Sequence, residues 1–151
     1  MTASRAYMLP SAGVDWLTPK RIYRWLEGEY EPFAFDPAPY PRPSGFDGLR
    51  EDWSGPWYCN PPYGRGIGRW VEKGETAWTW ARVRGVFLLP ARTDTRWYAR
   101  YAPLGQVTFF TGRISFERPD GTKAPAPFPS LALAFGYGTG VRVQQVPKEE
   151  A

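Results

Sequence analysis

The chain alternates between short apolar runs, which are typical of buried strands, and longer stretches in which apolar residues recur at helical spacing. The first predicted helix begins at Thr18 and Pro19, because threonine is a good N-cap and proline fits the first helical position. A second helix is predicted over residues 67–83, where Gly85 stops it, and a third over residues 93–101.

Strands are predicted where apolar residues form short, continuous runs. Residues 86–90 are apolar throughout, as expected of a strand that is covered on both faces. Strands alternate with helices over the first two thirds of the chain, and further strands close it. We therefore expect an α/β layer fold with helices on both faces of a sheet and an antiparallel hairpin at one edge. The other predicted strands span residues 33–35, 57–59, 107–110, 114–116, 131–135 and 141–143, with a loop over 117–129.

Size and composition favour a single domain over residues 1–151. A chain of 151 residues with 42% hydrophobic residues can bury one packed core. We expect residues 1–14 to form a loose lead-in and residues 147–151 to form a charged tail. There is no apolar run near the roughly 18 residues of a membrane-spanning helix and no signal-peptide pattern, which predicts a soluble, cytoplasmic protein.

Two residue counts exclude several kinds of site. The chain has no histidine, which rules out imidazole metal ligands and nucleophiles activated by histidine. Its one cysteine, Cys59, cannot form an intramolecular disulfide or a thiolate zinc cluster. We expect no metal.

The positive charge is a modest indication of a polyanionic partner. The net charge is +4, and of the 19 basic residues 15 are Arg and 4 are Lys. Arginine binds phosphates and base edges through its planar fork of donors, which favours a nucleic acid. A GC-rich genome that favours arginine codons explains the same bias, so both interpretations stand.

Two polar segments follow predicted strands. Asp36 and Pro37 come after the strand at 33–35, and the sequence Asn60-Pro61-Pro62-Tyr63 comes after the strand at 57–59. Ligands of α/β sheets gather at the carboxyl ends of strands, so this placement alone makes both segments candidates. The alternative for the second segment is a rigid turn without function, since Asn-Pro and Pro-Pro are turn signals.

The second segment suits methyl transfer to a conjugated amino nitrogen. The lone pair of an adenine amino group is delocalised into the ring, which makes the nitrogen a poor nucleophile. The side-chain oxygen of Asn60 and the carbonyl of Pro61 could each accept one amino hydrogen and draw the nitrogen toward tetrahedral geometry. Pro62 makes the loop rigid, so the acceptors are preorganised where charge develops. Tyr63 could stack on a base rotated out of a duplex.

The segment Asn60 to Tyr63 resembles the catalytic loop of amino-methyltransferases that depend on S-adenosylmethionine. In particular, the chain resembles the short phage-type (Dam-like) DNA N6-adenine methyltransferases over roughly residues 15–135. Asp36 is not followed by the glycine-rich loop of larger methyltransferases. Further blocks of the resemblance are Asp15 to Pro19, Phe35 to Ala38, Asp47 to Leu49 with Trp53, Leu88 to Trp97, Gly112 to Phe116, and Phe128 to Ser130.

The resemblance implies an abbreviated Rossmann-like class I methyltransferase sheet that binds S-adenosylmethionine and duplex DNA in a bacterial or phage-infected cell. Asn60 to Tyr63 would hold the target adenine. The implied cofactor-binding residues are Asp36, Pro37, Thr18, Pro19 and Asn60. DNA contacts are assigned to polar residues after the catalytic loop and after the strand at 86–90, namely Arg65, Arg69, Arg92, Thr93 and Arg96.

Three alternatives remain at this stage. The same loop chemistry serves methylation of RNA adenine and of a protein glutamine amide, since both nitrogens are conjugated. A non-catalytic module that binds nucleic acid through aromatic and arginine side chains is the third. The basic charge and the series of phage-type blocks favour DNA.

Overall fold

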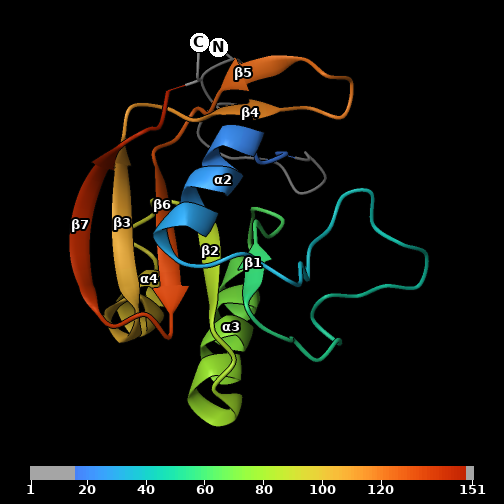
Figure 1. Ribbon diagram of the computed structural model, residues 1–151, viewed down its shortest axis with the longest axis vertical. Helices are drawn as coiled ribbons and strands as arrows, with labels where there is room; N and C mark the ends of the chain where they lie inside the picture. The colour runs from blue at the N-terminus through green and yellow to red at the C-terminus, as the bar shows by residue number, and fades with distance from the viewer. Residues whose placement is uncertain (1–15, 149–151) are drawn as a thin grey trace.

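The computed structural model describes residues 16–148, and Figure 1 shows one twisted sheet with helices packed against it. The sheet consists of β1 (Trp57–Cys59), β2 (Gly85–Pro90), β3 (Gln106–Thr111), β6 (Ser130–Phe135) and β7 (Gly140–Gln145). These strands lie in the order β1-β2-β6-β3-β7. All run in one direction except β6, which is antiparallel to both of its neighbours. The predictions for these five strands are confirmed, with ends shifted by at most two residues.

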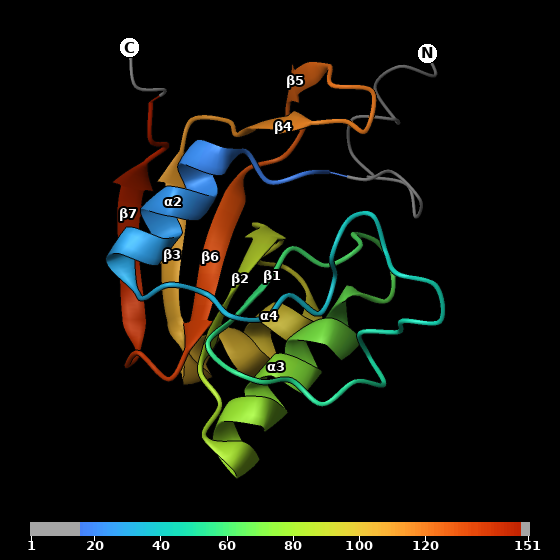
Figure 2. The same ribbon diagram turned by 45° about the vertical axis from the view of Figure 1, so that its right-hand side comes forward.

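Helices cover both faces of the sheet, as predicted (Figure 1, Figure 2). α2 (Lys20–Glu29) lies on one face, and α3 (Ile67–Ala81) and α4 (Arg96–Tyr101) lie on the other. Successive residues of a strand point to opposite faces, and β1 shows this directly. Trp57 packs against Gly74 of α3, whereas Tyr58 contacts Tyr23 of α2. The short β1 is therefore buried on both faces, and Asn60 is the residue that follows it.

The start of α2 differs from the prediction in a way that bears on function. The N-cap is Pro19, and the first helical residue is Lys20. Thr18 does not cap the helix, because its hydroxyl lies 2.5 Å from the hydroxyl of Tyr58. The carbonyl of Pro19 instead accepts the first backbone hydrogen bonds of the helix, from the amides of Ile22 and Tyr23.

Two other helix boundaries also differ from the prediction, for local reasons. α3 ends at Ala81 because Arg82 takes the left-handed conformation, with φ of 57°. Gly85 is not the stop that was predicted; it is the first residue of β2. A Cβ on Gly85 would overlap the indole of Trp57, so only glycine fits at this position. α4 begins at Arg96, not at residue 93, because Thr95 accepts a hydrogen bond from the amide of Tyr98 and caps it. The turn Ala102–Leu104 follows it as a 3-10 helix.

The predicted antiparallel hairpin at one edge of the sheet is wrong. The antiparallel strand β6 lies between β2 and β3 in the interior of the sheet, and all of its residues are buried. The edge strand β7 is parallel to β3 and mostly exposed. A hairpin does exist, but β4 (Ser115–Glu117) and β5 (Lys123–Pro125) form a separate two-stranded sheet. β5 falls within the segment that was predicted to be a loop.

The segment at 33–35 makes only an isolated parallel bridge, Phe35 to Trp57, beyond β1. The amide of Tyr58 donates to the carbonyl of Phe35, and that of Ala34 donates to Pro56. Pro32 and Pro37 flank the segment and have no N–H to extend the ladder. This bridge places Asp36 and Asn60 after adjacent parallel segments.

Within residues 16–148, no helix is long and apolar enough to cross a membrane.

Candidate active site

The side chain of Asn60 is held by the segment that precedes α2. Its Nδ2 donates to the carbonyl of Trp16 at 2.5 Å and to the hydroxyl of Thr18 at 3.2 Å. A carbonyl can only accept, so the contact with Trp16 fixes which end of the amide is nitrogen. Both hydrogens of Nδ2 are used in this way. The oxygen Oδ1 is buried and has no hydrogen-bond partner among the described residues.

The Thr18 hydroxyl lies between the side chains of Tyr58 and Asn60, which are 40 and 42 residues away in the sequence. Thr18 precedes α2, whereas Tyr58 and Asn60 lie at the end of β1. Tyr58 and Asn60 are two residues apart, which puts both side chains on the same face of the extended segment. Burial raises the pKa of Tyr58 well above its ordinary value, so its hydroxyl stays protonated.

The prolines and the tyrosine of the loop have different surroundings. Pro61 is buried and Pro62 is exposed. The Tyr63 ring is only 3% exposed, its hydroxyl donates to the carbonyl of Leu88 at 3.3 Å, and its edge packs against Phe128. The face predicted to stack on a base is therefore not open here. Tyr63 instead attaches the loop to β2 and the core.

Asp36 is a partly buried carboxylate without a counterion. Its Oδ1 accepts the amide hydrogen of Ala38 at 2.8 Å, and among residues 16–148 it makes no ion pair. Burial raises the pKa of Asp36 to about 6, and the one backbone hydrogen bond opposes this only in part. Its charge also contributes to the raised pKa values of Tyr58 and Cys59, which places the carboxylate beside the end of β1.

Pro37 and Pro19, both predicted to bind the cofactor, are buried in packing contacts. Pro19 caps α2. The carbonyl of Pro37 lies so close to Gly48 that a Cβ there would be 1.9 Å away. Pro37 therefore fixes the loop around Gly48 against the segment that carries Asp36.

The five residues assigned to DNA lie on segments that follow β1 and β2. Arg65, Arg69, Thr93 and Arg96 are exposed, and Arg92 is half-buried. Because β1 and β2 are parallel, the loops that begin at Asn60 and after Pro90 leave the same edge of the sheet. α4 has only 6 residues, so its N-terminus offers a weak dipole at best.

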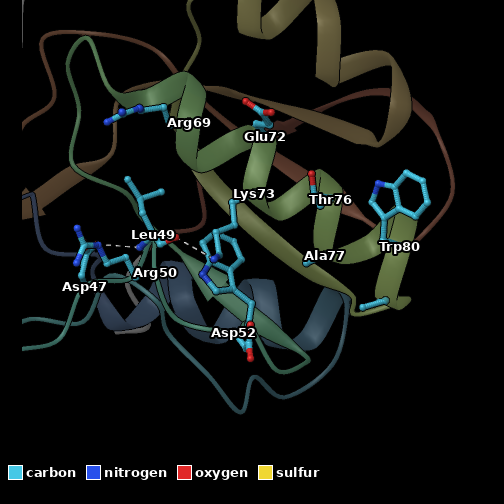
Figure 3. Close-up of a pocket in the computed structure, with 12 residues that line it drawn as sticks. Asp47, Leu49, Arg50, Asp52, Arg69, Glu72, Lys73, Thr76, Ala77 and Trp80 are labelled. Atoms are coloured by element: carbon cyan, nitrogen blue, oxygen red, sulfur yellow. Dashed lines mark hydrogen bonds and ion pairs between the residues drawn. The ribbon is translucent and has the colours of Figure 1, made fainter.

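Asn60 and Asp36 do not line either of two grooves on the surface formed by residues 16–148. One, of about 530 Å³, lies at the start of α2 and includes Pro19 and Trp25. The other, of about 800 Å³, lies between residues 47–53 and α3 (Figure 3). Asn60 is half-buried, with its Oδ1 covered by neighbouring atoms. The charged residues of the larger groove are Asp47, Arg50, Asp52, Arg69, Glu72 and Lys73.

No cluster of three or more potential metal ligands occurs among the residues that the structure describes. The side chains of Asn60, Thr18, Tyr58 and Asp36 supply amide, hydroxyl and carboxylate groups. Sequence reasoning missed two members of the site, Tyr58 and the Trp16 carbonyl. The spacing of Tyr58 and Asn60 in a strand could have identified Tyr58, but a backbone carbonyl has no sequence signal.

A family model described as DNA N-6-adenine-methyltransferase (Dam) matches residues 8–128. The match includes Asp36, Asn60 and the whole loop to Tyr63, and it ends before β6. A search of curated proteins and a search of solved structures found no match. The family acts on adenine in DNA and generally uses S-adenosylmethionine. Since the model covers most of the chain, this protein belongs to the DNA N-6-adenine-methyltransferase (Dam) family.

Proposed function

We propose that this protein transfers a methyl group from S-adenosylmethionine to the N6 nitrogen of adenine in duplex DNA, with the target base rotated out and held at Asn60 to Tyr63. The observation that carries the proposal is the Asn60 carboxamide. Its two N–H groups are occupied by Trp16 and Thr18, which leaves the buried Oδ1 without a partner among residues 16–148. A buried acceptor without a partner is costly unless a ligand donor satisfies it.

The adenine amino group is a donor of the required kind. One N6 hydrogen would be accepted by Asn60 Oδ1 and the other by the carbonyl of Pro61. These two acceptors stabilise N6 as it gains positive character. In the overall reaction N6 forms a bond to the methyl carbon, the sulfur–carbon bond breaks, and N6 loses one proton to solvent.

The residues near Asn60 fit the cofactor. S-adenosylmethionine carries an ammonium group on its methionine part and, when bound, supplies a methyl group on a sulfonium centre. Asp36, a partly buried carboxylate with no counterion within the described part of the chain, is suited to hold that ammonium. Thr18 stands between Asn60 and Tyr58 and would border the same space. Pro37 and Pro19 support the loops that carry these groups.

The sheet supports the Rossmann-like interpretation. Asp36 and Asn60 follow adjacent parallel segments, and ligands of such sheets bind beyond the carboxyl ends of the strands. Because Oδ1 is buried, entry of the base requires a local opening of the loops around Asn60. Stacking by Tyr63 would in addition require its ring to leave Phe128.

Phosphate contacts are proposed for the loops that leave the same edge of the sheet. Arg65 follows the catalytic loop, and Arg92, Thr93 and Arg96 follow β2, where they could position the duplex. Arg69 lines the groove beside α3 and is placed to reach DNA that extends over that helix.

Incubation of the protein with radiolabelled S-adenosylmethionine tests the substrate class. Duplex DNA, RNA and a protein mixture are offered separately, and the DNA or RNA is then digested to nucleosides. We expect labelled N6-methyladenine from DNA alone. Label found only in RNA or only in protein would contradict the proposal. The absence of any label, together with DNA binding that does not depend on Asn60, would favour a binding module.

A further inference from the structure

One side-chain hydroxyl and one backbone carbonyl fix the orientation of the Asn60 carboxamide. An unrestrained asparagine can flip its amide and exchange oxygen for nitrogen at almost no cost. Here the Trp16 carbonyl and the Thr18 hydroxyl both lie next to Nδ2. A flipped amide would set Oδ1 against the Trp16 carbonyl, which is a contact between two acceptors.

Thr18 is itself held in place by Tyr58. The two hydroxyl oxygens are 2.5 Å apart, and the Tyr58 side chain is fully buried. The Tyr58 ring packs edge-on against Tyr23 of α2 and is tilted against Phe33. Because the ring cannot turn away, its hydroxyl restricts the Thr18 rotamer that receives the hydrogen from Asn60.

We propose that Thr18, supported by Tyr58, is a positioning residue that holds the Asn60 carboxamide with Oδ1 toward the N6 of the target adenine. The inference deepens the proposed function and rests on it for the identity of the substrate. The orientation itself can be measured without any substrate. Thr18 thus acts through Asn60 and forms no bond with the reacting atoms in this role.

The orientation is accessible by NMR because Asn60 is the only asparagine in the chain. Labelling with ¹⁵N-asparagine gives one side-chain amide signal with two hydrogens. In the full-length protein we expect both hydrogens to exchange with solvent at least about tenfold more slowly than those of a free amide, since both are donated inside the protein.

Thr18→Val keeps the shape of the side chain and removes the hydroxyl. We expect the hydrogen that faces Thr18 to lose its protection, while the one bonded to Trp16 stays protected. Thr79→Val is the matched control, since Thr79 bonds to Glu75 on the exposed side of α3 and should change neither hydrogen. Unchanged exchange of both hydrogens in Thr18→Val would overturn the proposal.

Methyl transfer gives the second readout. Thr18→Val should lower kcat by about tenfold or more, with the KM for DNA changed by less than about threefold. Thr18→Ser restores the hydroxyl and should recover most of the lost rate. Equal losses in the Val and Ser variants would indicate a role in packing and would contradict the positioning role.

Tyr58→Phe carries the test if Thr18→Val fails to fold. It removes the hydroxyl that restrains Thr18 and should raise the exchange of the same Asn60 hydrogen and lower kcat by about two- to fivefold. No change in either quantity overturns the proposal. A wild-type protein that transfers no methyl group to DNA would contradict the proposed function. An active wild type with an equally active Thr18→Val would contradict the positioning role alone.

Discussion

Asn60 and Asp36 follow adjacent parallel segments of the sheet, yet their side chains differ in charge and in the number of hydrogen bonds that hold them. The Asn60 amide is fixed by hydrogen bonds to Trp16 and Thr18, and a single acceptor is left over. The Asp36 carboxylate is partly buried and, among the residues that the structure describes, has one backbone hydrogen bond and no cation. The first is an uncharged group whose orientation does not depend on pH, and the second is a charge that lowers stability. A substrate amino group and a cofactor ammonium would compensate the two respectively.

The largest effect is expected from Asn60→Asp, which keeps an oxygen at the acceptor position but removes both donors. A carboxylate cannot donate to Trp16, and one of its oxygens would face that carbonyl. We expect kcat to fall by about 10²–10³ while cofactor affinity changes by less than about fivefold. Steady-state kinetics and a thermal shift with S-adenosylmethionine measure the two quantities. An active Asn60→Asp would show that the donors are not needed.

Asp36→Asn should stabilise the protein without cofactor. The pKa of Asp36 is raised by burial to about 6 in the folded protein, from 3.8 for a solvent-exposed aspartate, so the folded state holds its proton to higher pH. Stability from this group is complete below about pH 4 and is lost as the pH rises through about 6. The free energy of unfolding of the variant should therefore exceed that of wild type by roughly 3 kcal/mol at neutral pH and equal it near pH 4.

Urea unfolding of both proteins over this pH range measures the difference. Asp36→Asn can retain the hydrogen bond to the Ala38 amide, so the comparison reports mainly on charge. A difference between the two proteins that does not vary with pH would contradict the assignment of an uncompensated carboxylate.

Asp36→Asn should weaken cofactor binding, although it stabilises the protein without cofactor. If the carboxylate holds the ammonium of S-adenosylmethionine, the affinity of wild type rises as the pH passes upward through about 6, because the carboxyl is then ionised. Asp36→Asn should bind about tenfold more weakly near neutral pH and show little of this pH dependence. Calorimetric titration at several pH values measures both. Equal affinities would remove Asp36 from the cofactor site.

The smallest effect is expected from Arg96→Ala, which lies outside both polar segments. Loss of one exposed phosphate contact should weaken DNA binding about two- to fivefold and reduce the slope of log affinity against log salt by about one. Methyl transfer at saturating DNA should stay near the wild-type rate. Arg118→Ala, in the β4–β5 turn, serves as the comparison. An equal loss in both variants would point to general charge instead of a specific contact.

The sequence predicted the elements of the fold better than their arrangement. The apolar runs that became β2 and β6 were recognisable because both strands are buried on both faces. The interior position of β6 was not, because spatial order depends on packing between distant segments. β5 was missed since Lys123, Ala124 and Pro125 have no apolar alternation.

The candidate site shows the same division. Asn60 and Asp36 could be identified from their motifs and their places after strands. The orphaned Oδ1 could not be foreseen, because it depends on the Trp16 backbone and on a Thr18 hydroxyl that helix-capping rules assign elsewhere. The buried Tyr63 ring likewise depends on Phe128, which is far away in the sequence.

The most direct test of the role of Asn60 is the yield of N6-methyladenine in duplex DNA after incubation with S-adenosylmethionine and either wild type or Asn60→Ala. Mass spectrometry of the digested DNA quantifies it, and a thermal shift confirms that both proteins fold and bind the cofactor. We expect methyladenine with wild type and a yield lower by at least about 10² with the variant. Comparable yields from the two proteins would contradict the assignment of Asn60 as the group that activates the adenine amine.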